Sequence, residues 1–269
     1  MVAARPARPR APRWRLESMA DRRLGRLAIR IAALVLFIGI WQAAGDDSIN
    51  LLFPTFTRTV SVWWDLVESG VLPIALLITN QTLFVGFLIV LVLGIPIGIF
   101  TARIKLMDKI VSPYLTFLVA IPMIAIIPVI QALLGLTFAA RVTVVVLFAI
   151  PYVVINTAVA VRRVDPVLTE MAFSFGASRL MTLRDVVLPA AVPGMMAGIR
   201  IALGQALIGM VVAELTIVGA GIGSLIADLQ GRFRVAPVLA VACSIVIEGI
   251  ILMSLVEWIE RRLGRWSKQ

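Results

Sequence analysis

The sequence predicts an all-α polytopic membrane protein with six transmembrane helices and both termini in the cytoplasm. Of the 269 residues, 61% are apolar and the mean hydropathy is +1.02. Only 15% are charged, against about 25% in soluble globular domains. Several uninterrupted apolar runs exceed the ~20 residues that a helix needs to cross the hydrocarbon core. These features exclude a soluble globular domain.

Six apolar stretches define the predicted spans. The first is short and follows several arginines, so a cleaved signal peptide is the alternative for it. We favour a retained span because Trp41-Gln42-Ala43-Ala44-Gly45 is a weak cleavage site and the preceding basic segment is long. The predicted spans cover residues 28–44, 74–101, 110–134, 139–161, 194–218 and 236–256.

Lysine and arginine gather in four segments, which predict the orientation. The segments are the N-terminal tail, the loops that follow the second and fourth spans, and the C-terminal tail. Six spans place all four on one side, which the positive-inside rule makes cytoplasmic. Contact with anionic lipid then accounts for the net charge of +10 without a nucleic-acid partner. The predicted organisation is a disordered basic tail (1–27), a transmembrane permease domain (28–260) and a cytoplasmic tail (261–269).

Three segments between the spans have helical patterns of their own. Residues 53–70 place tryptophans at helical spacing, which is typical of a helix lying at the membrane interface. The cytoplasmic loop 162–193 predicts an amphipathic helix that ends at Gly176, followed by a short helix from about Ser178 to Leu188 before Pro189. A further short helix is expected over 224–229, either as a gate or as a plain surface element.

The long cytoplasmic loop carries a recognisable motif. It reads Glu170-Met171-Ala172, three residues, Gly176, nine residues, Val186, one residue, Leu188-Pro189. This resembles the EAA motif of ABC-importer permeases, E-A-A-x3-G-x9-I-x-L-P, with methionine for one alanine and valine for isoleucine. The similarity covers about 50–265 and points to the branch that handles nitrate, sulfonates, taurine, bicarbonate and related solutes. Thr82 departs from the branch, where relatives often carry arginine.

The resemblance implies the partners and the coupling residues. The chain would be a permease that works as a homodimer with two ABC ATPase subunits and an extracytoplasmic solute-binding protein, in the bacterial cytoplasmic membrane. The cytoplasmic loop would be the coupling helix that enters a groove of the ATPase. The coupling residues would be Glu170, Met171, Ala172, Gly176, Leu188 and Pro189. The chain itself would be no enzyme and would need no cofactor.

Several chemistries are excluded by missing residues. There is no histidine, which removes Ser-His triads and HExxH zinc sites, and the single cysteine, Cys243, allows no disulfide framework. No Gly-Lys pair exists, so there is no P-loop for ATP. The glycines of 219–223 have the wrong spacing for a dinucleotide loop.

Ionisable residues inside the spans are the strongest pointers to a solute pathway, because each costs about 2.5–3.5 kcal/mol at mid-bilayer. Arg200 is expected to snorkel toward the cytoplasm. Glu214 lies on nearly the same helix face as Arg200 and is the leading candidate for a residue of the pathway or of a gate. The alternative is a structural carboxyl that bonds to a neighbouring helix. Glu248 is a weaker candidate. The predicted pathway or gate residues are Glu214, Gln81, Gln131, Asn156, Gly221 and Gly223.

The predicted function is the transmembrane permease subunit of an ABC importer for a small anionic or polar organic solute. Transport would proceed by alternating access driven by the separate ATPase subunits. A self-sufficient secondary transporter or channel is the alternative, and it predicts inverted repeats that the sequence does not show.

Overall fold

The computed structural model describes residues 14–45, 53–217, 219 and 221–263, and this part of the chain contains helices and connecting segments but no strand. The chain divides into two compact units, residues 1–61 and 62–269. In the first unit α1 spans Trp14–Ala44, and its apolar part is Ala28–Ala44. The helix thus extends into the segment expected to be a disordered tail, of which residues 1–13 lie outside the described residues. The helix α2 (Phe56–Glu68) leads into the second unit and confirms the helix predicted within 53–70, while its place at a membrane interface stays a prediction.

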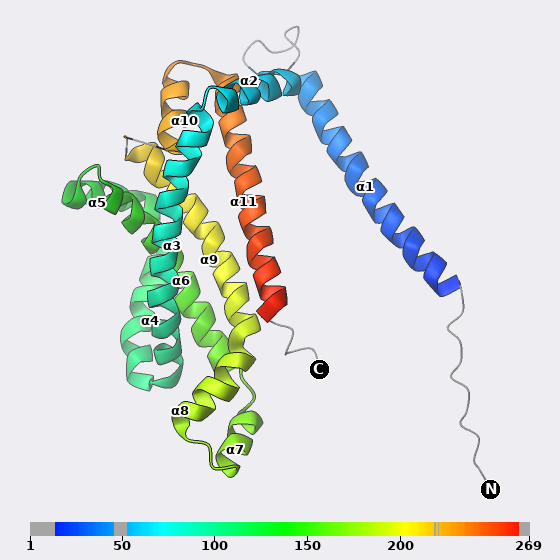
Figure 1. Ribbon diagram of the computed structural model, residues 1–269. Coiled ribbons are helices and arrows are strands. Elements are labelled where there is room, and N and C mark those ends of the chain that lie inside the picture. Colours follow the sequence, from blue (N-terminus) through cyan, green and yellow to red (C-terminus); the bar gives the residue numbers. More distant parts are fainter. Residues whose placement is uncertain (1–13, 46–52, 218, 220, 264–269) are drawn as a thin grey trace. The chain divides into compact units, whose positions relative to one another are not determined.

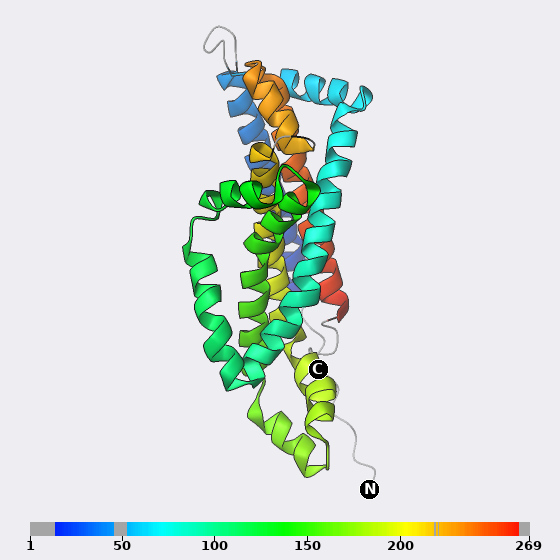
Figure 2. The same cartoon turned by 90° about the vertical axis from the view of Figure 1, so that its left-hand side faces the viewer.

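The second unit holds the other helices, with α3, α6 and α9 side by side (Figures 1 and 2). The short helices α7 and α8 lie at one end of this unit, and α10 lies at the other. The bounds are α3 (Val71–Arg103), α4 (Lys105–Ala120), α5 (Ile127–Leu134), α6 (Phe138–Arg162), α7 (Pro166–Ser174), α8 (Arg179–Thr182), α9 (Leu188–Thr216), α10 (Ile222–Gly231) and α11 (Val235–Leu263).

The core lies where α6 packs between α3 and α9. Leu83, Val90, Val153 and Met210 are buried there among smaller side chains. Glycines permit the close approach of the helices, because a Cβ on Gly94 would overlap Val153 and a Cβ on Gly198 would overlap Asn156. The four-residue spacing of Gly94 with Gly98 and of Gly194 with Gly198 is typical of such close helix contacts.

Among the described residues, four helical segments are long and apolar enough to cross a membrane. They are α3, α6, the continuous helix from α8 through α9, and α11, and they contain the predicted spans 74–101, 139–161 and 236–256 and nearly all of 194–218. A fifth crossing results if the bent pair α4–α5 counts as one span. The count of six and the cytoplasmic termini therefore stay predictions.

The span predicted over 110–134 is bent sharply in its middle. The helix α4 ends at Ala120, a 3₁₀ turn follows at Met123–Ala125, and the flanking helical segments are bent by 89°. Ile121 is extended (φ −75°, ψ 138°) because the ring of Pro122 disfavours a helical residue before it. The apolar run thus conceals a break.

The prediction that the second short helix of the cytoplasmic loop ends before Pro189 is wrong. The helix continues from Arg179 to Thr216 through a π turn at Leu183–Val187. In this turn the N–H of Leu188 bonds to the carbonyl of Leu183, five residues back. The wider turn accommodates a proline, which has no N–H to donate and whose ring crowds the carbonyl four residues before it.

Candidate functional site

The segment between α6 and α9 projects from one end of the second unit as two short helices (Figure 1). The helix α7 begins where the side chain of Asp165 accepts a hydrogen bond from the N–H of Val167 (2.9 Å), with proline as the first helical residue. It ends at Gly176, whose φ of 84° is left-handed. The N–H groups of Gly176 and Ala177 bond back to Phe173 and Ala172, which is a Schellman motif. The predicted turn at Gly176 is confirmed.

These two helices expose an unusual amount of apolar surface. Phe175 is 86% exposed and Leu180 is 74% exposed. On α7, Glu170 is exposed and Ala172 is half-buried. Contiguous exposed apolar side chains mark surfaces that bind other proteins or membranes. We call the following set the α7–α8 apolar surface: Val167, Leu168, Met171, Phe173, Phe175, Leu180 and Met181.

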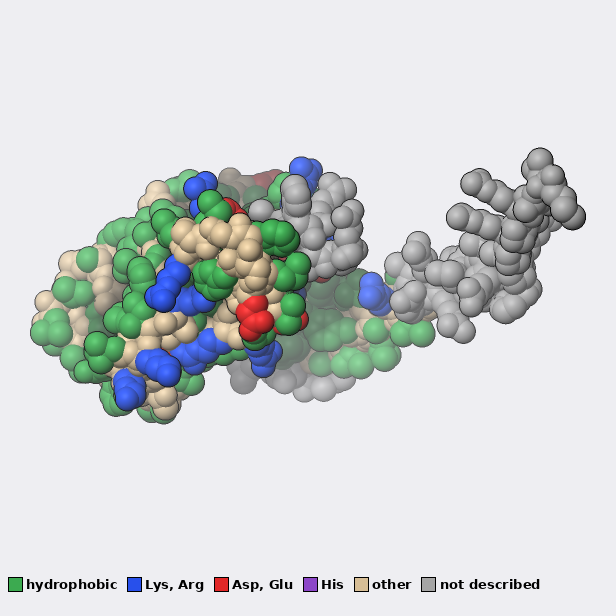
Figure 3. All heavy atoms as spheres, turned by 90° about the horizontal axis from the view of Figure 1, so that it is seen from below, with side chains coloured by type: hydrophobic (Ala, Val, Ile, Leu, Met, Phe, Trp, Pro, Cys, Tyr) green, Lys and Arg blue, Asp and Glu red, His purple; other side chains and the backbone are tan. Residues whose placement is uncertain are grey.

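Basic side chains gather on the face of the molecule at this same end (Figure 3). They come from the α3–α4 junction and from the segments around α7 and α8, which Figure 1 places near one another. The exposed basic residues of these segments are Arg103, Lys105, Lys109, Arg163, Arg179 and Arg184. The other two predicted coupling residues, half-buried Leu188 and exposed Pro189, form the start of α9.

Glu214 lies in a closed polar cluster near the opposite end. Its side chain is 0% exposed. Its Oε2 accepts hydrogen bonds from the Thr79 hydroxyl on α3 (2.8 Å) and from the N–H of Gly223 at the start of α10 (3.0 Å). The Thr79 hydroxyl in turn accepts from the N–H of Ile222 (2.8 Å). We call these four residues the Glu214 junction, because they join α3, α9 and α10.

Gly221 and Gly223 make room for this carboxyl. A Cβ on either glycine would overlap Glu214, and Gly221 has a φ of 95°. Free N–H groups at a helix N-terminus attract a carboxylate, so Glu214 caps α10. The side chain of Arg141 on α6 is buried as well.

Sequence reasoning missed Thr79 and Arg141. Thr79 belongs to a stripe of buried small residues on α3, with Ala75, Thr82 and Gly86, spaced three to four apart. Such spacing predicts a packed helix face and offered a signal for it. Arg141 stands close to a predicted span end, where an arginine is ordinary.

The three amides predicted for a pathway lie on three different helices. Gln81 is exposed on α3, Gln131 is half-buried on α5, and Asn156 on α6 donates to the carbonyl of Tyr152 in its own helix (2.7 Å). No hydrogen bond between described residues joins them to the Glu214 junction. The structure therefore brings Glu214, Gly221 and Gly223 together but not the amides.

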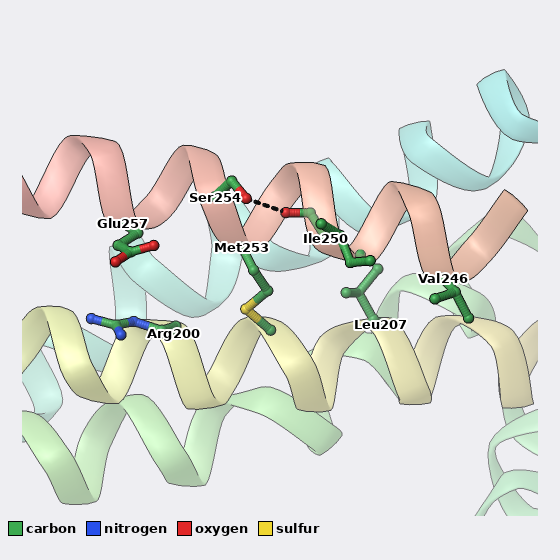
Figure 4. A pocket seen from close by; sticks show the side chains of 8 residues that line it. Arg200, Leu207, Val246, Ile250, Met253, Ser254 and Glu257 are labelled. Carbon is green, nitrogen blue, oxygen red and sulfur yellow. Dashed lines mark hydrogen bonds between the residues drawn. The ribbon is translucent and has the colours of Figure 1, made fainter. Parts of the chain in front are cut away.

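Arg200 pairs with Glu260 on α11, and its predicted reach toward the cytoplasm stays a prediction. It stands at one end of a groove of about 390 Å³ between α9 and α11, with Glu257 across from it (Figure 4). Next to these two residues along the groove, Met253 points from α11 toward α9. Both ionisable residues of α9 thus face other helices, and Arg200 ties α9 to α11.

Comparisons with known proteins agree on one family. A family model described as "Binding-protein-dependent transport system inner membrane component" matches residues 94–265. The putative aliphatic sulfonates transport permease protein SsuC of Bacillus subtilis is 31% identical over 86% of this chain and 84% of its own length. The riboflavin transport system permease protein RibX of Chloroflexus aurantiacus is 30% identical, over 87% and 88%.

A solved structure shares the fold. It is the inward-facing MetNI methionine ABC transporter, and the match has a TM-score of 0.63 at 21% identity, covering 75% of this chain and 97% of that one. At this identity the likeness concerns the fold alone.

Proposed function

The chain belongs to the family of binding-protein-dependent transport system inner membrane components, and from this premise we propose that its α7–α8 apolar surface receives the force that drives transport. It is the permease subunit of an ABC importer, a multi-pass protein of the bacterial cytoplasmic membrane. The predicted nitrate and sulfonate branch is confirmed.

The exposed apolar surface at the basic end is the observation that carries the proposal. Seven apolar side chains stand on two short helices that are capped by Asp165 and turned by Gly176, so their shape is fixed before any partner arrives. A preorganised surface loses less entropy on binding. We assign this end to the cytoplasm, where the surface enters a groove of an ATPase subunit and Glu170 bonds at its rim.

The complete importer follows from this assignment. Two copies of the chain form a homodimer, each copy engages one ATPase subunit, and a solute-binding protein docks at the opposite end, near α10. ATP hydrolysis takes place in the partner subunits. Their closure moves the coupling helices and exchanges the inward-open and outward-open states of the passage.

The solute is a small anionic or polar organic molecule. The names of the relatives, which concern aliphatic sulfonates and riboflavin, support this class. Within the passage, Glu214 with Gly221 and Gly223 acts as a closure that holds α10 in place. Gln81, Gln131 and Asn156 stay proposed contacts of the solute in other states of the cycle.

The test replaces residues of the apolar surface in the complete complex. Glu170→Ala and Phe175→Ser should each weaken binding of the ATPase subunits by about tenfold, which corresponds to 1.4 kcal/mol. ATP turnover in proteoliposomes should fall with it, while membrane insertion stays intact. Co-purification with the ATPase and ATP hydrolysis are the measurements.

A matched control is Phe233→Ser. Phe233 is 91% exposed near the other end of the second unit, between α10 and α11, so this variant should bind the ATPase normally. Equal behaviour of all three variants would remove the surface from the coupling role. Transport by the purified chain alone would favour the self-sufficient transporter instead.

A further inference from the structure

One guanidinium nitrogen joins three helices at the basic end of the second unit. The Nη2 of Arg162, the last residue of α6, lies 2.7 Å from Oδ1 of Asp108 on α4 and donates to the carbonyl of Thr101 on α3 (2.9 Å). The hydroxyl of Ser112 donates to the same Asp108 oxygen (2.7 Å). The Thr101 carbonyl belongs to the last turn of α3, where helix carbonyls lack partners and favour a cation. We call this arrangement the Arg162 clasp.

The helix α4 has few other attachments within the chain. Leu115 is the only buried side chain along its whole length, all of which the structure describes. Leu106 and Tyr114 are 65% and 68% exposed. The helix is separated from α3 by the extended residue Ile104 and is followed by the 89° bend. Helix α4 is therefore not continuous with a neighbouring helix at either end. The clasp holds α4 near the end that lies closest to α7.

Arg162 also stands directly before the coupling segment. Only residues 163–165 separate it from α7, and the last of these caps α7. A displacement of α7 therefore reaches the end of α6 through three residues, and it also reaches α8 and the π turn, against which α7 packs. At that point the clasp offers a polar connection from α6 to α4.

We propose that Arg162 is a positioning residue that makes α4 move together with the coupling segment, through its ion pair with Asp108. This inference rests on the proposed function, because it requires that the ATPase displaces α7. The two side chains are 44% and 39% exposed, so loss of the pair should change stability little. Its loss should instead free α4 from α7.

The test measures the distance between two spin labels, one on each helix. Tyr114→Cys on α4 and Ser174→Cys on α7 carry the labels in a Cys243→Ala background, and labelled chain is diluted with unlabelled chain in the complex with the ATPase. Between the nucleotide-free state and the state trapped with ATP and vanadate, the distance should stay within about 2 Å in the parent protein. In Asp108→Asn and Arg162→Gln it should shift further or broaden.

Two further variants separate the clasp from general effects of charge. The exchange of Asp108→Arg with Arg162→Asp restores the pair and should restore the constant distance. Asp228→Asn breaks a more exposed ion pair, with Arg232, that joins no second helix, and it should behave as the parent. A distance that already changes in the parent, or that stays constant in Asp108→Asn, overturns the proposal. ATP turnover by the parent complex, recorded in parallel, reports on the proposed function by itself.

Discussion

Thr79 uses its single hydroxyl twice, donating to Glu214 and accepting from the backbone of Ile222. In apolar surroundings an unpaired carboxyl or N–H is costly, so this one oxygen satisfies two groups at once. Glu214 could be found in the sequence because a carboxyl in an apolar run is rare. The spacing of small residues on α3 indicated a packed face that includes Thr79 but not its contact with Glu214, because the two are 135 residues apart and the contact depends on how two helices are rotated.

Replacement of Thr79 tests this arrangement. Thr79→Val keeps the shape but removes both hydrogen bonds, and each buried group left unpaired costs about 1–3 kcal/mol. The midpoint of thermal unfolding of the purified complex should therefore fall. Thr79→Ser keeps the hydroxyl and should unfold close to the parent. Similar midpoints for the two variants would show that the junction adds little stability.

At the scale of the elements, the prolines show where sequence reasoning fails. Pro96, Pro113, Pro151 and Pro193 all lie inside helices, and Pro122 follows the end of one. All five stand in apolar runs, so hydropathy treats them alike. Whether a proline interrupts a helix depends on whether neighbouring helices hold the chain straight. The long spans were therefore predictable, and the break in 110–134 was not.

The tryptophans of α2 give a test at this scale. The indole N–H of Trp63 donates to the Ser244 hydroxyl on α11 (2.8 Å), whereas that of Trp64 bonds to Glu68 in its own helix. Trp63→Phe should therefore cost about 1 kcal/mol, the value of one hydrogen bond, by loosening α2 from α11. Trp64→Phe should have a smaller effect. Limited proteolysis after α2 is the measurement, and equal cleavage rates would contradict the assignment.

At the scale of the whole molecule, the distribution of charge agrees with the path of the chain. The basic segments after α3 and α6 and the arginines near the end of α11 lie at helix ends that Figure 1 shows toward the same end of the second unit. The sequence allowed this grouping because every crossing reverses the direction of the chain. It did not reveal how the crossings pack, because small residues on several helices decide that together.

Cysteine labelling tests the orientation. Ser69 and Ser178 are exposed and lie near opposite ends of the second unit. In a Cys243→Ala background, Ser69→Cys should react from outside the cell with a reagent that cannot cross the membrane. Ser178→Cys should react only after permeabilisation. Labelling of Ser178→Cys in intact cells would invert the orientation.

The unbroken helix from Arg179 to Thr216 has a consequence for how far a movement travels. Its 38 residues span about 57 Å at ~1.5 Å per residue, nearly twice the ~30 Å of the hydrocarbon core. A rigid rod of that length, tilted by only ~5° about one end, displaces its other end by about 5 Å. Its first residues form α8, which carries exposed side chains. Glu214 stands near its other end, two residues before the last residue, Thr216. A small tilt imposed at the end nearest α7 is thus magnified by leverage into a shift that exceeds the 2.8 and 3.0 Å hydrogen-bond distances between Glu214 and its partners Thr79 and Gly223.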